Sequence, residues 1–356
     1  MNRRAIRRAT FEFTPLAGGR TALAGLLLGA WLACVGCSRK PSTASEEAPK
    51  AAGSQVFRIV RPKQLVGLSV LEKHGTLEKD LAPLGFTVQW LEFAAGPQQL
   101  EALNAGALDL ALTAESPPVF VQAAQAGGPL VYLATTASNG KTVSLLVHDG
   151  SPIKTLADLK GKKIAFQKAS IGHYLLVKAL ESVGLTLGDV QSVFLPPPDA
   201  NAAFSAGSVD AWLIWEPFPT RVVDAHVGHV LVDGERLRDT ANFYTTTRAF
   251  VDAHSDVLKI FLADLDRAET WSTAHPREMA ELLSPTLLID VPTLLQMHGK
   301  YQFGVRPISE PGIVKQQEVA DLWFRLGFLP SKVDVRAGFL PLTQYAALMP
   351  IAAAPH

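Results

Sequence analysis

Short apolar segments alternate with helical patterns along most of this chain, and this alternation constrains the fold more than any other feature. Apolar runs typical of strands occupy residues 56–60, 87–92, 108–112, 130–136, 143–148, 163–166, 190–195, 211–214 and 229–232. Helical patterns lie between them over 68–81, 97–105, 118–126, 171–183 and 200–206. Strands that alternate with helices predict an α/β fold with parallel strand pairs. Beyond about residue 252 we expect helices alone, over 261–272, 277–283 and 314–326.

The chain contains an internal echo at a constant offset. Residues 103–109 (LNAGALD) resemble residues 204–210 (FSAGSVD), and the same spacing relates Glu115 to Glu216, since 216 − 115 = 101 and 207 − 106 = 101. Each copy predicts a helix end, a glycine turn, a buried strand and a glutamate at the carboxyl edge of that strand. Ligands of open α/β sheets bind beyond these edges. We therefore expect two lobes of similar plan whose Glu-bearing loops face one cleft, with a chance match of common residues as the alternative.

Charge and cysteine content exclude several functional classes. The 33 basic residues balance 33 acidic ones, whereas a dedicated nucleic-acid binder carries a basic excess. The two cysteines, Cys34 and Cys37, are too few for a disulfide scaffold or a multi-cysteine metal cluster. The sequence contains no H-E-x-x-H, G-x-S-x-G or P-loop motif. We therefore expect no enzyme activity, no metal site, no cofactor and no nucleic-acid partner.

Residues 1–36 have the features of an export signal. Arginines precede an apolar stretch over 22–37, which is shorter than the roughly 20 residues of a membrane span. The run Cys34-Val35-Gly36-Cys37 resembles a bacterial lipobox. This predicts lipidation of Cys37, with Cys34 as a second candidate and an ordinary cleaved signal as the alternative. Residues 37–53 lack periodicity and predict a flexible tether. The expected location is the periplasm, with the protein anchored to a bacterial membrane by its N-terminal lipid.

Several turns between predicted strands and helices have the composition of ligand-binding loops. The run 169–173 (ASIGH) leads into a helix, where small residues allow close approach of the backbone and the helix dipole favours an anion. Ser170 either caps this helix or donates a hydrogen bond to the ligand. Lys63 either brings a positive charge to the cleft or is a solvated loop residue. Trp215 either forms an apolar wall or fills the core.

Four strings of residues resemble the aliphatic sulfonate-binding proteins of ABC importers. They are 90–103 (WLEFAAGPQQLEAL), 151–163 (SPIKTLADLKGKK), 173–176 (HYLL) and 209–217 (VDAWLIWEP). The likeness extends from about residue 56 to residue 336. The strings are fairly specific for the sulfonate, taurine and nitrate group and less specific for one ligand within it.

The resemblance implies a two-lobed periplasmic binding protein fold of type II with a double-strand hinge near 136–143 and 244–246. Lobe 1 is expected to comprise 54–138 and 244–356, and lobe 2 to comprise 139–243. Ala169 and Ile171 depart from the Gly and Asn that relatives often carry, and Glu216 departs from their common Asp. The residues expected to border the ligand cleft are Lys63, Gln64, Gly96, Pro97, Glu115, Ser116, Ser170, His173, Trp215 and Glu216.

Together these observations predict a monomeric solute-binding lipoprotein that captures a small organic anion and delivers it to an ABC permease and its ATPase. An aliphatic sulfonate is the expected ligand, and taurine, nitrate or a thiamine precursor is the alternative. The main rival is an enzyme of the same fold, similar to the pyrimidine synthases of thiamine biosynthesis. Those enzymes rely on a cysteine-rich motif, which the body of this chain lacks.

Overall fold

The computed structural model describes residues 55–125, 130–237 and 241–349. The predicted signal peptide, the tether and the lipidation site at Cys37 lie outside these residues. Within the described ranges, every helix is too short or too polar to cross a membrane.

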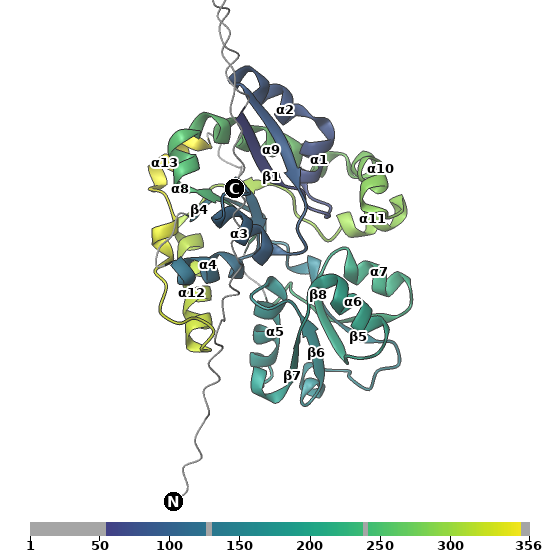
Figure 1. Cartoon of the computed structure of the whole chain (residues 1–356). Coiled ribbons are helices and arrows are strands. Elements are labelled where there is room, and N and C mark those ends of the chain that lie inside the picture. The colour runs from purple at the N-terminus through teal and green to yellow at the C-terminus, as the bar shows by residue number, and fades with distance from the viewer. Residues whose placement is uncertain (1–54, 126–129, 238–240, 350–356) are drawn as a thin grey trace, which may run out of the picture. The chain divides into compact units, whose positions relative to one another are not determined.

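Strands and helices alternate through the first two thirds of the described chain, which confirms the predicted α/β fold (Figure 1). The strands are β1 (Gln55–Val60), β2 (Phe86–Leu91), β3 (Ala111–Thr113), β4 (Leu130–Thr136), β5 (Val143–His148), β6 (Lys163–Phe166), β7 (Gln191–Phe194), β8 (Ala211–Trp215), β9 (Gly228–Asp233), β10 (Phe243–Thr247) and β11 (Val305–Arg306). The α-helices are α1 (Gly67–His74), α2 (Thr76–Leu81), α3 (Gly96–Asn104), α4 (Ser116–Gln125), α5 (Ile171–Glu181), α6 (Pro197–Ser205), α7 (Phe218–Asp224), α8 (Arg248–Ala253), α9 (Ser255–Ala274), α10 (Pro276–Leu287), α11 (Val291–His298), α12 (Glu310–Arg325) and α13 (Leu342–Leu348). Short 3₁₀ helices cover Ala82–Leu84, Gly140–Thr142, Leu156–Leu159, Leu187–Asp189 and Val335–Gly338.

Strands from the two ends of the described chain pair with one another, and strands from its middle form a separate sheet. β1 pairs with β2 in parallel, and a second sheet has the order β11-β4-β10-β3. A bridge between Ile59 and Leu110 connects β1 to the segment before β3. The middle strands form a five-stranded sheet of order β7-β6-β8-β5-β9, in which β6 is parallel to β7 and β8 while β5 is antiparallel to β8 and β9. This separation supports the predicted lobe boundaries, which stay a prediction.

Helices cover both faces of the five-stranded sheet because its strands are apolar on both sides. Leu145, Ile164 and Leu213 face one apolar cluster that includes residues of α5. Their neighbours in sequence, such as Leu146 and Trp212, face a second cluster with residues of α6 and α7. Figure 1 shows α5 on one side of β6 and β8, and α6 and α7 on the other.

The two copies of the internal echo adopt the same local structure. Gly106 and Gly207 both have φ +69°, a left-handed conformation that glycine adopts without strain, and each follows a helix end. Asp109 and Asp210 then repeat one hydrogen-bond pattern. The Asp109 carboxylate accepts from the N–H of Arg58 at 2.8 Å, and the Asp210 carboxylate accepts from the N–H of Lys163 at 2.7 Å. The echo is therefore a structural repeat, in which each aspartate connects its turn to the neighbouring strand by a hydrogen bond.

The structure differs from the sequence prediction in two places. The helix expected over 68–81 divides into α1 and α2 at Gly75, whose φ of +61° lies outside the helical range. The expectation that strands end after residue 252 was wrong, because β11 adds an edge to β4. This strand is two residues long, which is too short for a period-2 pattern to be recognised.

Two segments connect the sheets and run beside each other. One leads from β4 to β5 and the other from β9 to β10. The N–H of Thr136 donates to the carbonyl of Asn242 at 3.0 Å, and the N–H of Gly234 donates to the carbonyl of Gly140 at 3.1 Å. A Cβ on Gly140 would lie 2.6 Å from the carbonyl oxygen of Gly234, so only glycine allows this approach. The segment between β4 and β5 coincides with the predicted hinge segment 136–143. The segment between β9 and β10 immediately precedes the predicted hinge segment 244–246.

Candidate ligand-binding site

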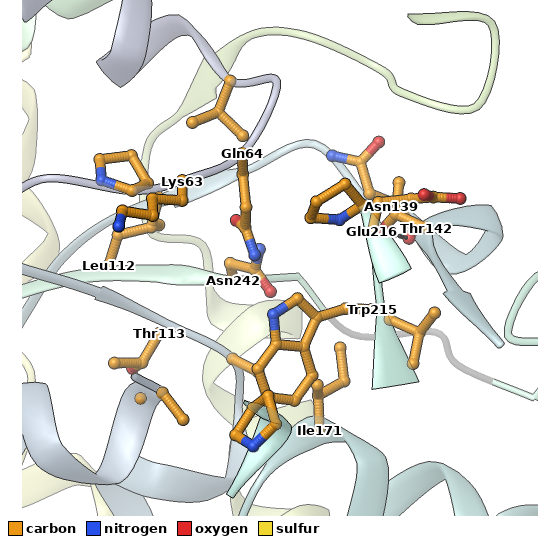
Figure 2. Close-up of a pocket in the computed structure, with 18 of the residues that line it drawn as sticks. Lys63, Gln64, Leu112, Thr113, Asn139, Thr142, Ile171, Trp215, Glu216 and Asn242 are labelled. Atoms are coloured by element: carbon orange, nitrogen blue, oxygen red, sulfur yellow. Dashed lines mark hydrogen bonds between the residues drawn. The ribbon is translucent and has the colours of Figure 1, made fainter. Parts of the chain in front are cut away.

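One cavity of about 520 Å³ lies where the two groups of strands meet at their carboxyl ends (Figure 2). Its volume falls in the range of pockets that hold small organic ligands. Both echo loops contribute to it, through Thr113, Ala114 and Pro117 on one side and Trp215–Phe218 on the other. The segments that connect the sheets, with the end of β4, contribute Thr136, Asn139, Thr142 and Asn242. The segments around residues 115 and 216 therefore share one pocket.

The structure places the residues expected at the cleft in two groups. Those that border the cavity are Lys63, Gln64, Gly96, Ser170, Trp215 and Glu216. Those that do not border it are Pro97, Glu115, Ser116 and His173. Direct contact of the first group with a ligand stays a prediction.

Ser170 caps a helix that begins at the cavity. Its hydroxyl accepts from the N–H of Gly172 at 3.1 Å and donates to the carbonyl of Gln167 at 2.7 Å. The hydroxyl is therefore engaged in the cap, which fixes the direction of α5. Ala169, with φ +58°, forms the turn before it. Ile171, the first residue of α5, borders the cavity and brings the positive end of the helix dipole toward it.

Two of the basic residues that border the cavity, Lys63 and Arg61, are paired with carboxylates. The ammonium group of Lys63 lies 2.7 Å from Glu92, and Lys63 is well exposed. Arg61 contacts Glu72 at 2.6 Å and Glu92 at 3.8 Å. These two residues therefore offer little uncompensated positive charge to an anion, whereas Arg221, which also borders the cavity, donates to the backbone carbonyl of Leu287.

Ser116 and His173 contact α12 and do not border the cavity, and Glu115 contacts the same helix through its backbone carbonyl. All three are fully buried. The carbonyl of Glu115 accepts from the side chain of Gln316 at 2.7 Å, and the Ser116 hydroxyl accepts from the indole of Trp323 at 3.2 Å. The sequence interpretation could not foresee this, because the orientation of each side chain depends on the distant helix that packs against it.

A buried polar residue beside the start of α3, Thr113, was not among the residues expected at the cleft. Thr113 borders the cavity, is 4% exposed, and its Oγ1 has no hydrogen-bond partner within the described part of the chain. Gly96 lies beside it, since a Cβ on Gly96 would be 3.3 Å from the Cβ of Thr113. Gln99 also borders the cavity, and its side-chain oxygen accepts from the N–H of Leu112 at 3.0 Å. The sequence signal that could have identified Thr113 is its position as a polar residue directly after the apolar run 108–112.

Aromatic side chains supply much of the remaining wall. Phe93, Trp215, Phe218, Tyr301 and Phe303 all border the cavity. Figure 2 shows the indole of Trp215 among the side chains that border the cavity. The site therefore combines a polar corner at the start of α3 with an apolar, aromatic wall, which suits a ligand with a charged head and an organic tail.

The fold and this cavity define the class of periplasmic solute-binding proteins, in which a ligand is held between two α/β units. Groups of three or more potential metal-ligating side chains do not occur among the described residues.

Comparisons with known proteins identify the family. Residues 62–284 match the model of the NMT1-like family. The chain is 36% identical over 326 residues, 91% of its length and 97% of the relative, to an aliphatic sulfonates-binding protein of Escherichia coli (strain K12). The crystal structure of the alkanesulfonate-binding protein SsuA from Xanthomonas axonopodis pv. citri, bound to MOPS, is 33% identical with a TM-score of 0.77, and the match covers 81% of this chain and 99% of that one. The periplasmic SsuA of Escherichia coli has a TM-score of 0.73, is 36% identical, and its match covers 81% of this chain and 92% of that one. The chain therefore belongs to the NMT1-like family and, within it, to the aliphatic sulfonate-binding proteins of ABC importers, which are solute-binding proteins and not enzymes.

Proposed function

We propose that this protein captures an organic sulfonate in the 520 Å³ cavity and delivers it to an ABC permease. The observation that carries the proposal is the similarity to SsuA of Xanthomonas axonopodis pv. citri, whose structure contains the sulfonate MOPS. Taurine- and nitrate-binding proteins match this chain at lower identity, 26% and 24%. The order of similarity therefore favours a sulfonate with a larger organic group.

The sulfonate group is proposed to bind at the start of α3. Thr113 carries a buried hydroxyl without a partner among the described residues, and such a group costs free energy until a ligand accepts its hydrogen bond. The first turn of α3 begins at Gly96 and presents backbone N–H groups, which favour an anion. Because hydrogen bonds to a charged acceptor are stronger than those between neutral groups, the sulfonate oxygens suit this corner.

The organic tail is proposed to lie against the aromatic wall that includes Trp215 and Phe93. Burial of apolar surface contributes about 0.8 kcal/mol per methylene group. Each added methylene is therefore expected to tighten binding about fourfold until the cavity is filled. Taurine has a charged amine on a short tail and gains little from this wall.

Closure of two lobes over the ligand is part of the proposal. The separate sheets and the paired connecting segments around Thr136 and Asn242 support lobes at 54–138 with 244–356, and at 139–243. A ligand that contacts both units only in the closed form stabilises that form. We further propose that a lipid on Cys37 anchors the protein to the membrane beside its permease, which the lipobox-like sequence supports.

Isothermal titration calorimetry of the purified protein tests the function. We expect binding of MOPS and of a series from ethane- to octanesulfonate, with affinity rising along the series, and weaker binding of taurine and nitrate. Heat with nitrate or taurine and none with any alkanesulfonate would overturn the proposal. Hexanoate, with a planar carboxylate on a similar tail, is the matched control for recognition of the sulfonate group.

A further inference from the structure

A buried carboxylate borders the cavity that is proposed to take an anion. The side chain of Glu216 is 0% exposed, and its Oε1 accepts from the hydroxyl of Thr220 at 2.9 Å. A negative charge in a buried wall disfavours a second negative charge nearby, because the interior screens charges less than water does. Anion binding therefore requires that the charge of Glu216 be compensated.

The compensating charge comes from a distant part of the chain. The ammonium group of Lys300 lies 2.6 Å from Glu216 Oε1 and 2.9 Å from the hydroxyl of Thr220. Lys300 lies between α11 and β11, whereas Glu216 follows β8 in the five-stranded sheet. Lys300 does not border the ligand cavity but a neighbouring hollow of about 220 Å³, which Lys141 and Glu235 also border. Lys300 therefore contacts Glu216 from the side of the cavity wall that faces away from the ligand.

The other cations that border the cavity have hydrogen-bond or ion-pair partners other than Glu216. The cavity is bordered by the cations Arg61, Lys63 and Arg221 and by the carboxylic acids Glu92, Glu216 and Glu269. Arg61 and Lys63 contact Glu92, and the guanidinium of Arg221 donates to the carbonyl of Leu287 at 2.8 Å. Among the described residues, Lys300 is thus the cation that forms an ion pair with Glu216.

We propose that Lys300 is a positioning residue for anion binding, which neutralises Glu216 from outside the cavity and holds the loop of Trp215 in place. This inference rests on the proposed function. It explains how an anion site tolerates a buried glutamate at the end of β8. It also assigns Glu216 the role of an anchor for the cleft wall rather than that of a ligand contact.

Calorimetry with MOPS on four variants tests the proposal. Lys300→Met leaves Glu216 uncompensated, and we expect the dissociation constant to rise about tenfold or more. The double variant Lys300→Met with Glu216→Gln removes both charges and is expected to bind within about threefold of the wild type. Lys300→Arg keeps the charge and is expected to bind like the wild type. Thr220→Val removes a hydrogen bond but no charge and serves as the matched control, with an expected change below about threefold.

Rescue by the second substitution separates charge compensation from a purely structural role. If the double variant binds as weakly as Lys300→Met, or if Lys300→Met binds normally, the proposal is overturned. The melting temperature of the ligand-free variants provides a second test, in which Lys300→Met should lower it and Glu216→Gln should restore it. A wild-type protein that binds no sulfonate would contradict the proposed function, while an unchanged melting temperature in Lys300→Met would contradict the compensation itself.

Discussion

The imidazole ring of His173 lies 4.5 Å from the indole ring of Trp323 and 4.7 Å from the ring of Phe328, measured between ring centroids. His173 lies on α5, beside the five-stranded sheet, whereas Trp323 lies on α12 near the C-terminal end of the described chain. The histidine expected at the ligand is therefore an apolar contact between segments that are 150 residues apart, since 323 − 173 = 150.

His173 is expected to make the protein sensitive to acid. Burial, together with the charge of Lys168, lowers the pKa of His173 from 6.5 to about 3. Between pH 6.5 and about pH 3, His173 is protonated in the unfolded chain but neutral in the folded protein. The stability that neutral His173 contributes is therefore present above about pH 6.5 and is lost as the pH falls toward 3. We expect the melting temperature of His173→Phe to fall less than that of the wild type between pH 7 and pH 4. If the melting temperatures of the two proteins fall by the same amount between pH 7 and pH 4, His173 is not the group responsible for the acid sensitivity.

Glu269 is expected to make the folded protein less stable as the pH rises, which is opposite to the effect of His173. It borders the cavity, its carboxylate accepts from the N–H of Gly304 at 3.0 Å, and burial raises its pKa from 4.5 to about 7. The folded protein then holds a proton that the unfolded chain releases. The contribution to stability is present below about pH 4.5 and is lost as the pH rises through 7.

Thermal melts between pH 5 and pH 8 measure this contribution. A shift of this size corresponds to a stability change of about 3 kcal/mol over the full titration. We expect the melting temperature of Glu269→Gln to decline less across this range than that of the wild type. An identical decline in the two proteins would show that another group titrates.

Thr113→Val is expected to separate ligand affinity from stability. The substitution keeps the shape of the side chain and removes a buried hydroxyl that lacks a partner among the described residues. A hydrogen bond to a charged group contributes about 1.5–3 kcal/mol, so the affinity for MOPS should fall by roughly 10- to 100-fold. The melting temperature without ligand should stay the same or rise. Thr142→Val, at another threonine that borders the cavity, is the comparison, and an equal loss in both variants would argue against a specific role of Thr113.

Lipidation is expected at Cys37. The protein expressed in a bacterial host should partition into the detergent phase of Triton X-114, and mass spectrometry should find its N-terminal peptide beginning with an acylated Cys37. Cys37→Ala should move the protein to the aqueous phase, whereas Cys34→Ala, the matched control, should leave it in the detergent phase. The reverse behaviour would assign the lipid to Cys34, and aqueous partitioning of the wild type would indicate an ordinary cleaved signal.

Local sequence patterns predicted most of the fold because strand and helix periodicity depends on neighbouring residues. The echo also predicted the paired turns, since Gly106 and Gly207 have the same left-handed φ. The site was predicted less well. Ile171 and His173 are two residues apart on α5 and point to nearly opposite sides of the helix, so a loop motif alone does not tell which of them faces the ligand.

Partners from distant segments could not be predicted at all. Lys300 contacts Glu216 from 84 residues away, and Trp323 contacts His173 across 150 residues, since 323 − 173 = 150. Neither contact has a local pattern, because the packing of the C-terminal segments against the rest of the fold creates both of them. Sequence therefore indicated the loops that surround the cavity, while tertiary packing determined which side chains enter it.

A crystal structure of the protein with MOPS would show where the sulfonate group binds. We expect the sulfonate oxygens to lie within hydrogen-bond distance of Thr113 Oγ1 and of the backbone N–H groups at the start of α3, with the morpholine ring against Trp215. A sulfonate bound elsewhere, or one held at the rim by Lys63 and Arg61 without contact to Thr113, would contradict this expectation.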